Sequence, residues 1–586
     1  IDGAFLNPDI DFPQIFSEID DGIIGTFATC FFENVSKTWE DLNYLDEMQK
    51  KYWEYNRTLQ VNLLSCADER KGGADVTQFP KDVGLFEEWV KYIVKRYNGN
   101  ITYYQIDTEP SIEKFEGTKE QFVEMHNLAY NAAKRANPDV IIMGSGWTFG
   151  GLFIDNPSEE EFDDRLLELK DRDVDLYEWA NWTLEAFEYF IQYGKYDAVS
   201  IHANRHWNEA NGTVDYIRKY TDKSIIIEDA MSGPDYMGIL DLPSTYYSDY
   251  ETYYRILHDS SNPNYLAARN LVEAEQSRYY TKKAVYAFAS GMDQIYISWT
   301  TDQKEYDLPV WRFVGILGAD EFVDPPVVRK KPIFYTYKLM VEKLDGFVEV
   351  ETIDEFVYKF LFEDKDPVYV LWSEDGDKGV DLSSYLETSN VLVTHLVTVD
   401  GEEMPETEVV SASSVPVGDS PIFVEETSAE PTSCNLISAS WSETEAVEGE
   451  VVSLVVEGSE KCDGLSVDFS VWEDDLLGDD YIQNDPVSVV FDGGRASTSW
   501  VAEWQRDGLL GGDPEYYFGA VVDGDEIKSE NLLSVSKRGG VVCGDGICGV
   551  DEDCPEDCER GIDRFGLHAI WDRTEDTRNL DIALIR

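Results

Sequence analysis

Two glutamates, Glu109 and Glu228, each follow directly on a short run of apolar residues. The run Ile101–Ile106 ends at the sequence Asp-Thr-Glu-Pro, and the run Ser224–Ile227 ends on Glu228. Short apolar runs between amphipathic stretches predict buried strands, and the carboxyl ends of such strands carry the chemistry of many α/β folds. Either carboxylate taken alone is equally well explained as a helix cap or a loop residue, so the pair matters more than each residue.

A pair of carboxylates at one cleft has a specific chemical use, which is the cleavage of a glycosidic bond. One carboxylic acid donates a proton to the leaving oxygen, and the other group, as a carboxylate, attacks the anomeric carbon. Direct attack with retention of configuration needs carboxyl groups about 5–5.5 Å apart. Mutual repulsion and burial raise the pKa of the donor and separate the two roles. We expect Glu109 and Glu228 to form such a pair.

Strands and helices alternate from the N-terminus to about residue 347, which predicts an α/β fold of the (β/α)8, or TIM, barrel type. Six stretches are continuous apolar runs typical of buried parallel strands, with a helical pattern between each pair. These stretches are LQVNLLS (59–65), ITYYQI (101–106), VIIMGSG (140–146), YDAVSIHANRHW (196–207), SIIIEDA (224–230) and DQIYISWTT (293–301).

The two strands needed to complete eight are predicted at the far end of the chain. Arg564–Asp572 has the pattern of a strand and Asp576–Ile585 that of a short helix, and Arg586 continues into Ile1 as a second strand. The sequence therefore predicts a barrel that is circularly permuted, or one that is completed by a neighbouring chain in a head-to-tail filament. An unrelated tail is the remaining interpretation.

Changes in the spacing of apolar residues and in composition divide the chain into six segments. After the barrel, period-two alternation predicts an antiparallel β-sandwich domain packed beside it, and a further set of short alternating strands predicts an immunoglobulin-like sandwich. The segments are the barrel (1–347), the antiparallel β-domain (348–427), a linker (428–433), the immunoglobulin-like sandwich (434–537), a cysteine-rich module (538–560) and the first barrel strand with its helix (561–586).

The eight cysteines fall into local groups, which is typical of disulfides in an extracellular or cell-surface protein. We expect Cys434 to pair with Cys462 inside the sandwich. Four more cysteines have a spacing unlike the Cys-x2-Cys knuckles of zinc sites, and we expect them to pair among themselves. They are Cys543, Cys548, Cys554 and Cys558. The acidic residues between them are candidate ligands of a structural calcium ion. They are Asp545, Asp551 and Asp553.

Acidic residues dominate the composition, with 116 Asp and Glu against 48 Lys and Arg and a formal net charge of −68. This charge excludes nucleic acids and anionic membrane surfaces as partners. No stretch of the sequence reaches the roughly 20 apolar residues of a membrane-spanning helix.

The two strand-end motifs resemble those of the clan A glycoside hydrolases, particularly the family 39 and family 5 type of β-glycosidase with an attached β-sandwich. The resemblance lies in Asp-Thr-Glu-Pro at 107–110 and Ile-Ile-Ile-Glu-Asp at 225–229, and it covers the barrel and the adjoining β-domain. With the two completing strands counted first, these motifs end strands four and seven. The resemblance implies that Glu109 is the acid/base and Glu228 the nucleophile, that the substrate is a carbohydrate, and that catalysis needs no cofactor.

Further residues take their roles from the same resemblance. It implies that His202 contacts the substrate, that Trp299 lines the subsite beside the cleaved bond, and that Arg586 supports the nucleophile. Thr108 stands where these enzymes have an asparagine that hydrogen-bonds the sugar 2-hydroxyl. Trp147, at the end of another predicted strand, is either a packing residue or a platform for a sugar ring.

Three functions are compatible with these features. The first is a secreted, retaining glycoside hydrolase that cleaves a β-linked polysaccharide or glycoconjugate. The second is an extracellular structural subunit that assembles head to tail through its C-terminal segment, and the third is a carbohydrate-binding adhesin without turnover. The pair of glutamates favours the enzyme, whereas Thr108 and the arrangement of the chain ends favour the filament.

Overall fold

The computed structural model forms two compact units, Ile1–Thr432 and Ser433–Arg586, which we describe separately. The structure describes residues 14–15, 18–19, 24–32, 45–47, 49–55, 58–67, 76–111, 113–203, 206–230, 256–257, 259–296, 300–302, 313–320, 327–429, 434–474, 480–482, 484, 486–505, 513–522, 525–538, 566–569 and 582–585.

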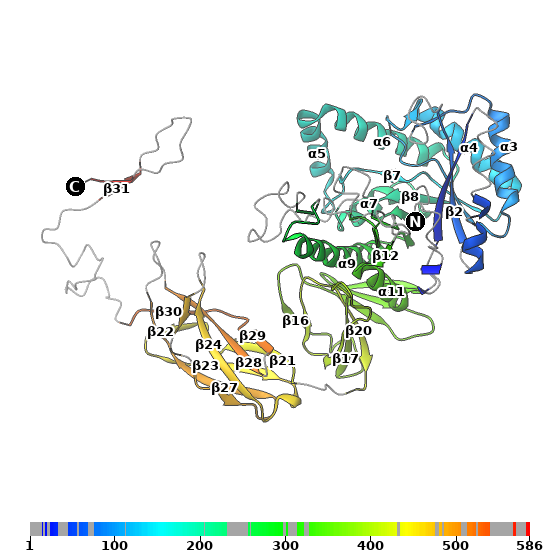
Figure 1. The fold of residues 1–586 in the computed structure, drawn as a ribbon. Coiled ribbons are helices and arrows are strands. Elements are labelled where there is room, and N and C mark those ends of the chain that lie inside the picture. Colours follow the sequence, from blue (N-terminus) through cyan, green and yellow to red (C-terminus); the bar gives the residue numbers. More distant parts are fainter. Residues whose placement is uncertain are drawn as a thin grey trace. The chain divides into compact units, whose positions relative to one another are not determined.

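Seven parallel strands form the main sheet of the first unit (Figure 1). In their order across the sheet, the strands are β1 (Ile24–Phe31), β2 (Thr58–Ser65), β4 (Tyr103–Ile106), β6 (Ile141–Met143), β8 (Ala198–His202), β9 (Ser224–Asp229) and β10 (Gln294–Ile295). Each strand pairs in parallel with the next one. The short strand β7 (Trp147–Thr148) also pairs with β8. Chain order and spatial order coincide, as in a (β/α)8 barrel, and among the described residues the run is open between β10 and β1.

The prediction of six strands in this region is wrong, because β1 is a seventh. Its sequence, IGTFATCF, mixes apolar residues with Gly, Thr and Cys and so lacks the continuous apolar run that marks the other strands. Cys30 in β1 forms a disulfide with Cys66 just after β2, with the Cα atoms 5.5 Å apart. Among the described residues, the run of parallel strands is therefore one strand short of eight, where the sequence had indicated two.

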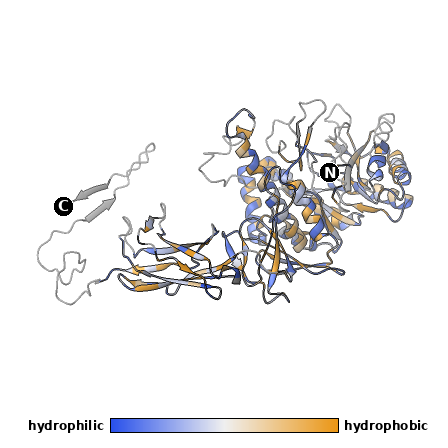
Figure 2. Cartoon of the chain, turned by 60° about the horizontal axis from the view of Figure 1, so that its bottom comes forward, coloured by the Kyte–Doolittle hydropathy of each residue, from blue (hydrophilic) through white to orange (hydrophobic). Residues whose placement is uncertain are grey.

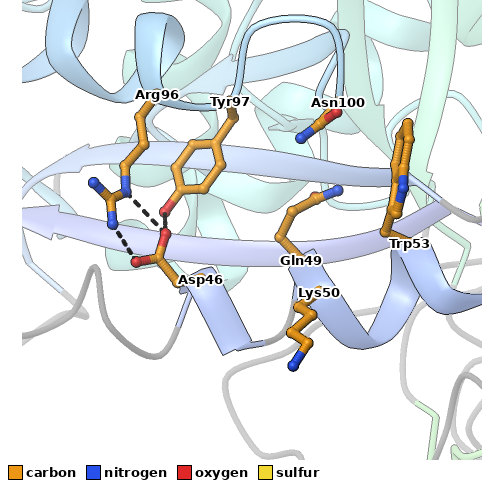
Figure 3. Close-up of a pocket in the computed structure, with 7 residues that line it drawn as sticks. All are labelled: Asp46, Gln49, Lys50, Trp53, Arg96, Tyr97 and Asn100. Atoms are coloured by element: carbon orange, nitrogen blue, oxygen red, sulfur yellow. Dashed lines mark hydrogen bonds and ion pairs between the residues drawn. The ribbon is translucent and has the colours of Figure 1, made fainter.

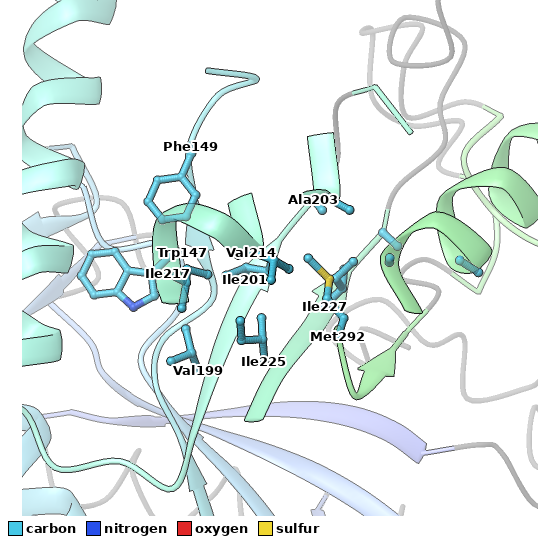
Figure 4. Packing of buried hydrophobic residues seen from close by; sticks show 14 of the residues in the cluster. Trp147, Phe149, Val199, Ile201, Ala203, Val214, Ile217, Ile225, Ile227 and Met292 are labelled. Carbon is cyan, nitrogen blue, oxygen red and sulfur yellow. The ribbon is translucent and has the colours of Figure 1, made fainter. Parts of the chain in front are cut away.

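Helices follow most of these strands and bury their apolar sides against the sheet. They are α3 (Val83–Arg96), α4 (Lys119–Ala136), α5 (Glu159–Arg172), α6 (Val174–Tyr193), α7 (Glu209–Arg218), α9 (Tyr265–Ala289) and α11 (Pro332–Leu344). Helix α4 begins with a capping box, in which Thr118 and Gln121 satisfy each other's free backbone amides. Figure 4 shows the helix-facing side of β8 and β9, where Val199 and Ile225 lie beneath Ile217 of α7.

Alternation along the strands decides which residues face the helices and which face the inner side of the sheet. The odd-numbered residues of β8 and β9 pack against helices, so the even-numbered residues point inward. Met143, Ala198 and Ile226 form a small apolar cluster of their own on the inner side. The polar residues of this inner side assemble the site described below.

Two short sheets brace the loops of the first unit. Strand β3 (Thr77–Gln78) pairs in parallel with β5 (Phe115–Glu116), which fixes the chain on either side of β4. Strand β11 (Leu317–Asp320) forms an antiparallel hairpin with β12 (Val327–Lys330).

An antiparallel β-domain follows α11 within the same unit. Its six-stranded sheet has the order β13 (Glu349–Asp354), β14 (Val357–Leu361), β15 (Val368–Leu371), β20 (Ile422–Thr427), β17 (Asn390–His395) and β18 (Thr407–Ser411). A second pair of strands is β16 (Lys378–Val380) with β19 (Val415–Val417). One face of the sheet joins the core of the parallel-sheet region through residues such as Phe360 and Trp372. The other face encloses a separate cluster that includes Leu371 and Val424.

The second unit contains a sandwich of two β-sheets. One sheet has the order β21 (Leu436–Trp441), β23 (Val451–Gly458) and β27 (Arg495–Val501). The other contains β22 (Glu445–Val447), β30 (Leu533–Ser536), β28 (Glu515–Val522), β24 (Ser466–Glu473) and β25 (Asp480–Ile482), with β26 (Val489–Val490) and β29 (Asp525–Lys528) at its sides. Trp441 of the first sheet packs against Phe518 of the second, with ring centroids 5.0 Å apart. The alternating colours of these strands in Figure 2 reflect one inward and one outward side.

The predicted disulfide between Cys434 and Cys462 is confirmed, with Cα atoms 4.3 Å apart. The other four predicted disulfide cysteines, Cys543, Cys548, Cys554 and Cys558, lie outside the described residues. The same holds for the proposed calcium ligands, Asp545, Asp551 and Asp553. Among the residues that the structure describes, no group of three or more His, Cys, Asp or Glu residues is placed to hold a metal ion.

The C-terminal segment forms a hairpin in its described part. Strand β31 (Gly566–Ala569) pairs antiparallel with β32 (Ile582–Ile585). The predicted helix Asp576–Ile585 is therefore wrong over its last four residues, which are extended. In its described residues the segment has two paired strands, whereas a first barrel unit is a strand followed by a helix. The structure thus gives no support to head-to-tail assembly through this segment.

Candidate active site

The carboxyl ends of three strands bring Glu109, His202 and Glu228 together. Glu109 lies just beyond β4, His202 ends β8, and Glu228 lies near the end of the neighbouring strand β9. His202 Nδ1 lies 2.9 Å from Glu109 Oε1, and His202 Nε2 lies 3.4 Å from Glu228 Oε2. The two glutamates predicted from the sequence are thus joined by one imidazole ring at one edge of the sheet.

The two contacts of His202 restrict where the protons of the site lie. A neutral imidazole donates at only one nitrogen, and an ionised carboxylate only accepts. Both contacts are therefore hydrogen bonds in two states: an imidazolium between two carboxylates, or a neutral ring between one protonated and one ionised glutamate. In the second state Glu109 donates to Nδ1 and Nε2 donates to Glu228, which gives one acid and one carboxylate.

The carboxylate of Glu228 is surrounded by side-chain hydrogen-bond donors, and 5% of the Glu228 side chain is exposed. Gln60 and Asn62 donate to its Oε1 at 2.6 and 2.9 Å, and the Ser200 hydroxyl donates to its Oε2 at 3.1 Å. Burial by itself raises the pKa of Glu228, but the hydrogen bond and the charge interaction with His202, followed by the hydrogen bond from Asn62, lower it, and the net pKa is below its ordinary value. Glu228 is therefore held as a carboxylate.

Glu109 has a different environment, because a quarter of its side chain is exposed. Its Oε2 forms an ion pair with the Lys114 ammonium group, which comes from the turn before β5. The two carboxyl groups are therefore distinguished by their surroundings: Glu228 is buried among neutral donors, and Glu109 faces solvent beside a cation.

The backbone around Glu109 adopts a conformation that is uncommon for residues other than glycine. Asp107 has φ of 64° and Glu109 has φ of 45°, which places both in the left-handed region. The Asp107 amide donates to the Leu63 carbonyl, and the Glu109 amide donates to the Gly146 carbonyl, each at 3.1 Å. These bonds to the strands on both sides hold the turn that aims Glu109 at His202.

Asp107 stabilises this turn from beneath the site. Its carboxylate accepts the Thr108 amide at 2.8 Å and the Thr77 hydroxyl at 2.9 Å. Because the side chain is fully buried, its pKa is raised to about 6, although these two hydrogen bonds oppose the effect of burial. Asp107 is thus a positioning residue for the Glu109 turn.

Gly146 leaves the space that the His202 ring occupies. A β-carbon placed on Gly146 would lie 2.1 Å from His202 Nε2, closer than any real contact. The same residue accepts the Glu109 amide and forms a parallel bridge with Thr108. Gly146 therefore contacts both the His202 ring and the backbone of the Glu109 turn.

A buried lysine holds the chain beyond His202. Lys283 of α9 is 1% exposed, and its ammonium group contacts the carbonyl of Ala203. The Ala203 amide in turn donates to the carbonyl of Asp229 at 2.9 Å. Burial lowers the pKa of Lys283 to about 8, against the opposing charges of Glu209 and Asp229. The ends of β8 and β9 are therefore tied together just past the site.

Comparison with solved structures finds glycoside hydrolases. No protein-family model and no curated protein matches the chain. It is similar to a family 39 glycoside hydrolase from the gut symbiont Bacteroides cellulosilyticus WH2, with a TM-score of 0.44 and 11% identity over 72% of this chain and 78% of that one. It is also similar to a glucosidase from Croceicoccus marinus, with a TM-score of 0.40 and 13% identity over 71% of this chain and 92% of that one. We therefore base the functional proposal on the geometry of the site.

The other predicted site residues have different outcomes. Trp147 is completely buried and packs edge-on against Phe122 and Phe187, which favours a packing residue over a sugar platform, the two roles considered for it. Thr108 lies in the Glu109 turn and is partly exposed. Trp299 and Arg586 lie outside the described residues.

The sequence analysis missed the residues that surround the two carboxylates, although part of the signal was present. Gln60 and Asn62 interrupt the apolar strand LQVNLLS at every second position, which indicates one polar side of a buried strand. Ser200 and His202 do the same in AVSIH. Lys114 carried no such signal, because a turn after β4 brings it back to Glu109.

Proposed function

We propose that this protein is a retaining glycoside hydrolase that cleaves a β-linked polysaccharide or glycoconjugate. The observation that carries this proposal is the contact of Glu109 and Glu228 with the two nitrogens of one imidazole. In one of the two protonation states that these contacts allow, the ring is neutral, one carboxyl group is protonated and the other is ionised, as double displacement requires.

The environments of the two glutamates support distinct roles. Glu228, buried and held ionised, attacks the anomeric carbon and forms a covalent glycosyl ester as the bond to the leaving oxygen breaks. Glu109, which is nearer to solvent, gives its proton to that oxygen. In the second step Glu109 takes a proton from water, the water oxygen bonds to the anomeric carbon, and Glu228 leaves as a carboxylate. Direct attack needs carboxyl groups about 5–5.5 Å apart, and two oxygens held on opposite nitrogens of the His202 ring lie further apart than this. The proposal therefore includes a movement of the Glu109 side chain away from His202 and toward Glu228 when the substrate binds.

Lys114 adds a requirement to the first step. Its ammonium group pairs with Glu109 and favours the ionised carboxylate, whereas proton donation needs the acid. The proposal therefore requires the Lys114 side chain, which is 42% exposed, to turn toward solvent when a sugar binds beside Glu109. Substrate binding would then convert Glu109 from an ion-pair partner into a proton donor.

An extracellular location is part of the proposal. The disulfides Cys30–Cys66 and Cys434–Cys462 support an oxidising compartment. Among the described residues, no helix is long and apolar enough to cross a membrane.

The test is hydrolysis of a panel of aryl β-glycosides and β-linked polysaccharides by the wild type and two variants. Glu228→Gln should lower kcat by at least about 10³-fold, and Glu124→Gln, an exposed glutamate of α4, is the matched control. The first product should keep the β configuration in a proton NMR time course. Equal activity of wild type and Glu228→Gln, or an α product, would overturn the proposed mechanism.

A further inference from the structure

A surface hollow of about 440 Å³ lies at the opposite edge of the parallel sheet from the candidate active site. Asn100 in the hollow precedes β4 and Glu109 follows it, so the strand separates them by roughly 13 Å at about 3.3 Å per residue. The hollow is formed by the helical residues that precede β2 and by the end of α3. Its lining consists of Asp46, Gln49, Lys50, Trp53, Arg96, Tyr97 and Asn100 (Figure 3).

One wall of the hollow is a closed polar network. The Asp46 carboxylate accepts hydrogen bonds from Arg96 Nε at 2.9 Å and from the Tyr97 hydroxyl at 2.7 Å, and a second ion-paired contact joins it to the Arg96 guanidinium. The positive and negative charges of this wall offset each other. The guanidinium is therefore engaged by Asp46, and the ammonium group of Lys50, the other cation of the lining, points away from Gln49 and Trp53 (Figure 3). Both features disfavour a phosphate or other anion as the ligand beside Gln49 and Trp53.

The floor of the hollow contains the side-chain amide of Gln49. Gln49 is 5% exposed, and neither its Oε1 nor its Nε2 has a hydrogen-bond partner among the residues that the structure describes. Buried amides in proteins are almost always hydrogen-bonded, because leaving them unpaired costs free energy. In Figure 3 the Gln49 side chain extends toward Asn100 and Trp53, and its amide atoms lie just beneath the surface of the hollow.

The aromatic side chain of Trp53 lies at the end of the hollow opposite Arg96 (Figure 3). Trp53 is 55% exposed, although large aromatic residues are usually buried. Its ring offers a flat apolar surface beside the Gln49 and Asn100 amides (Figure 3). An exposed ring next to neutral hydrogen-bonding groups fits a ligand with one apolar face and a rim of hydroxyl groups.

We propose that this hollow is a second, non-catalytic binding site for a neutral pyranose unit of a glycan. The pyranose ring would stack on Trp53, and its hydroxyl groups would supply the missing partners of Gln49. The Asp46–Arg96–Tyr97 network would give the site a rigid wall. This site is independent of the reaction proposed above, and it would hold a chain of sugars at the far edge of the sheet.

The experiment measures binding of the full chain to an immobilised panel of β-linked gluco-, xylo-, manno-, galacto- and chito-hexasaccharides. Wild type is compared with Trp53→Ala, Gln49→Leu and the control Tyr385→Ala, which removes an exposed aromatic side chain of the β-domain. Gln49→Leu keeps the volume of the side chain and removes its amide. Thermal unfolding of each variant checks that the fold is kept.

We expect at least one hexasaccharide whose affinity falls tenfold or more in Trp53→Ala and threefold or more in Gln49→Leu, with Tyr385→Ala like the wild type. Turnover of a small aryl glycoside should be the same in all four proteins, which separates this site from the active site. The proposal is overturned if no hexasaccharide binds, or if Trp53→Ala binds every one of them as the wild type does.

Discussion

At the scale of single residues, the ion pair between Lys114 and Glu109 sets the protonation state of the proposed acid. Removing the ammonium group in Lys114→Met lessens the preference for the ionised carboxylate, so the acid form persists to higher pH. We expect the alkaline limb of the profile of kcat/KM against pH to move to higher pH. The measurement is this profile on an activated aryl glycoside.

Lys119→Met is the matched control for Lys114→Met. It also removes a lysine that pairs with a glutamate, Glu185, but on the surface of α4 and α6. Its pH profile should follow that of the wild type. An unchanged alkaline limb in Lys114→Met would show that the ion pair has no part in the ionisation of Glu109.

Asp107 gives the protein a specific dependence of stability on pH. Its pKa is about 6 in the folded state and near 3.8 otherwise, so between these values the folded chain holds a proton that the unfolded chain has lost. The stability contributed by the neutral carboxyl is complete below about pH 4 and is lost as the pH rises through about 6. The loss amounts to at most about 3 kcal/mol.

Asp107→Asn should remove this part of the pH dependence. The amide stays neutral, can still accept the Thr108 amide, and can donate to the Thr77 hydroxyl, which has the Lys114 carbonyl as an alternative acceptor. Urea unfolding at pH 4.5 and pH 7.5 should show a smaller loss of stability on raising the pH in this variant than in the wild type. The control is Asp139→Asn at an exposed position, and equal losses in all three proteins would contradict the prediction.

At the scale of elements, Gly146 determines how closely the chain after β6 approaches the end of β8. Gly146→Ala places a methyl group where His202 Nε2 lies, so the imidazole must leave its position between the two carboxylates. A displacement of about 1 Å in a catalytic group costs roughly 10²-fold in rate, which is the expected fall in kcat/KM. Gly84→Ala in α3 is the control, because its new methyl group makes only an ordinary contact. Full activity of Gly146→Ala would show that His202 need not bridge the glutamates.

The strands that carry the glutamates were predictable because the residues before each glutamate form an apolar run. In β9, for example, three isoleucines precede Glu228. Strand β1 was not, since its Gly, Thr and Cys residues give no such run. The direction of a side chain relative to the sheet was a second feature that the sequence did not predict. Trp147 follows a strand as a site residue would, yet its ring lies among the aromatic side chains of α4 and α6, a direction that depends on tertiary packing.

The geometry of the site depends on features that a sequence pattern does not encode. The left-handed turn at Asp107 and Glu109 is maintained by backbone bonds to Leu63 and Gly146 and by the hydrogen bonds of the Asp107 side chain, all of which depend on neighbouring strands. The C-terminal run Ile582–Ile585 was ambiguous for another reason. Short runs of Ile and Leu fit either a helix or a strand, and here the pairing with Gly566–Ala569 selects the strand.

At the scale of the whole molecule, the boundary between independent parts follows the hydrophobic cores. The parallel-sheet region and the β-domain share one core, in which Trp207 contacts Trp372 with ring centroids 5.8 Å apart. The salt bridges from Arg329 to Glu273 of α9 and Asp400 of the β-domain cross the same boundary. The sandwich of the second unit has a separate core. Residues 1–432 therefore form the smallest part that encloses the described site with its core intact.

This boundary predicts opposite results for two truncations of the chain. Residues 1–432 should unfold at the same temperature as the corresponding transition of the full chain and keep its activity on a small aryl glycoside. Residues 1–347 should aggregate or unfold at a much lower temperature, because Trp207 and its neighbours lose the cover of the β-domain. Each large side chain so exposed forfeits about 1.5–3 kcal/mol of burial. Calorimetry of the two truncated chains and the full chain is the measurement, and a stable, active 1–347 fragment would show that the shared core is dispensable.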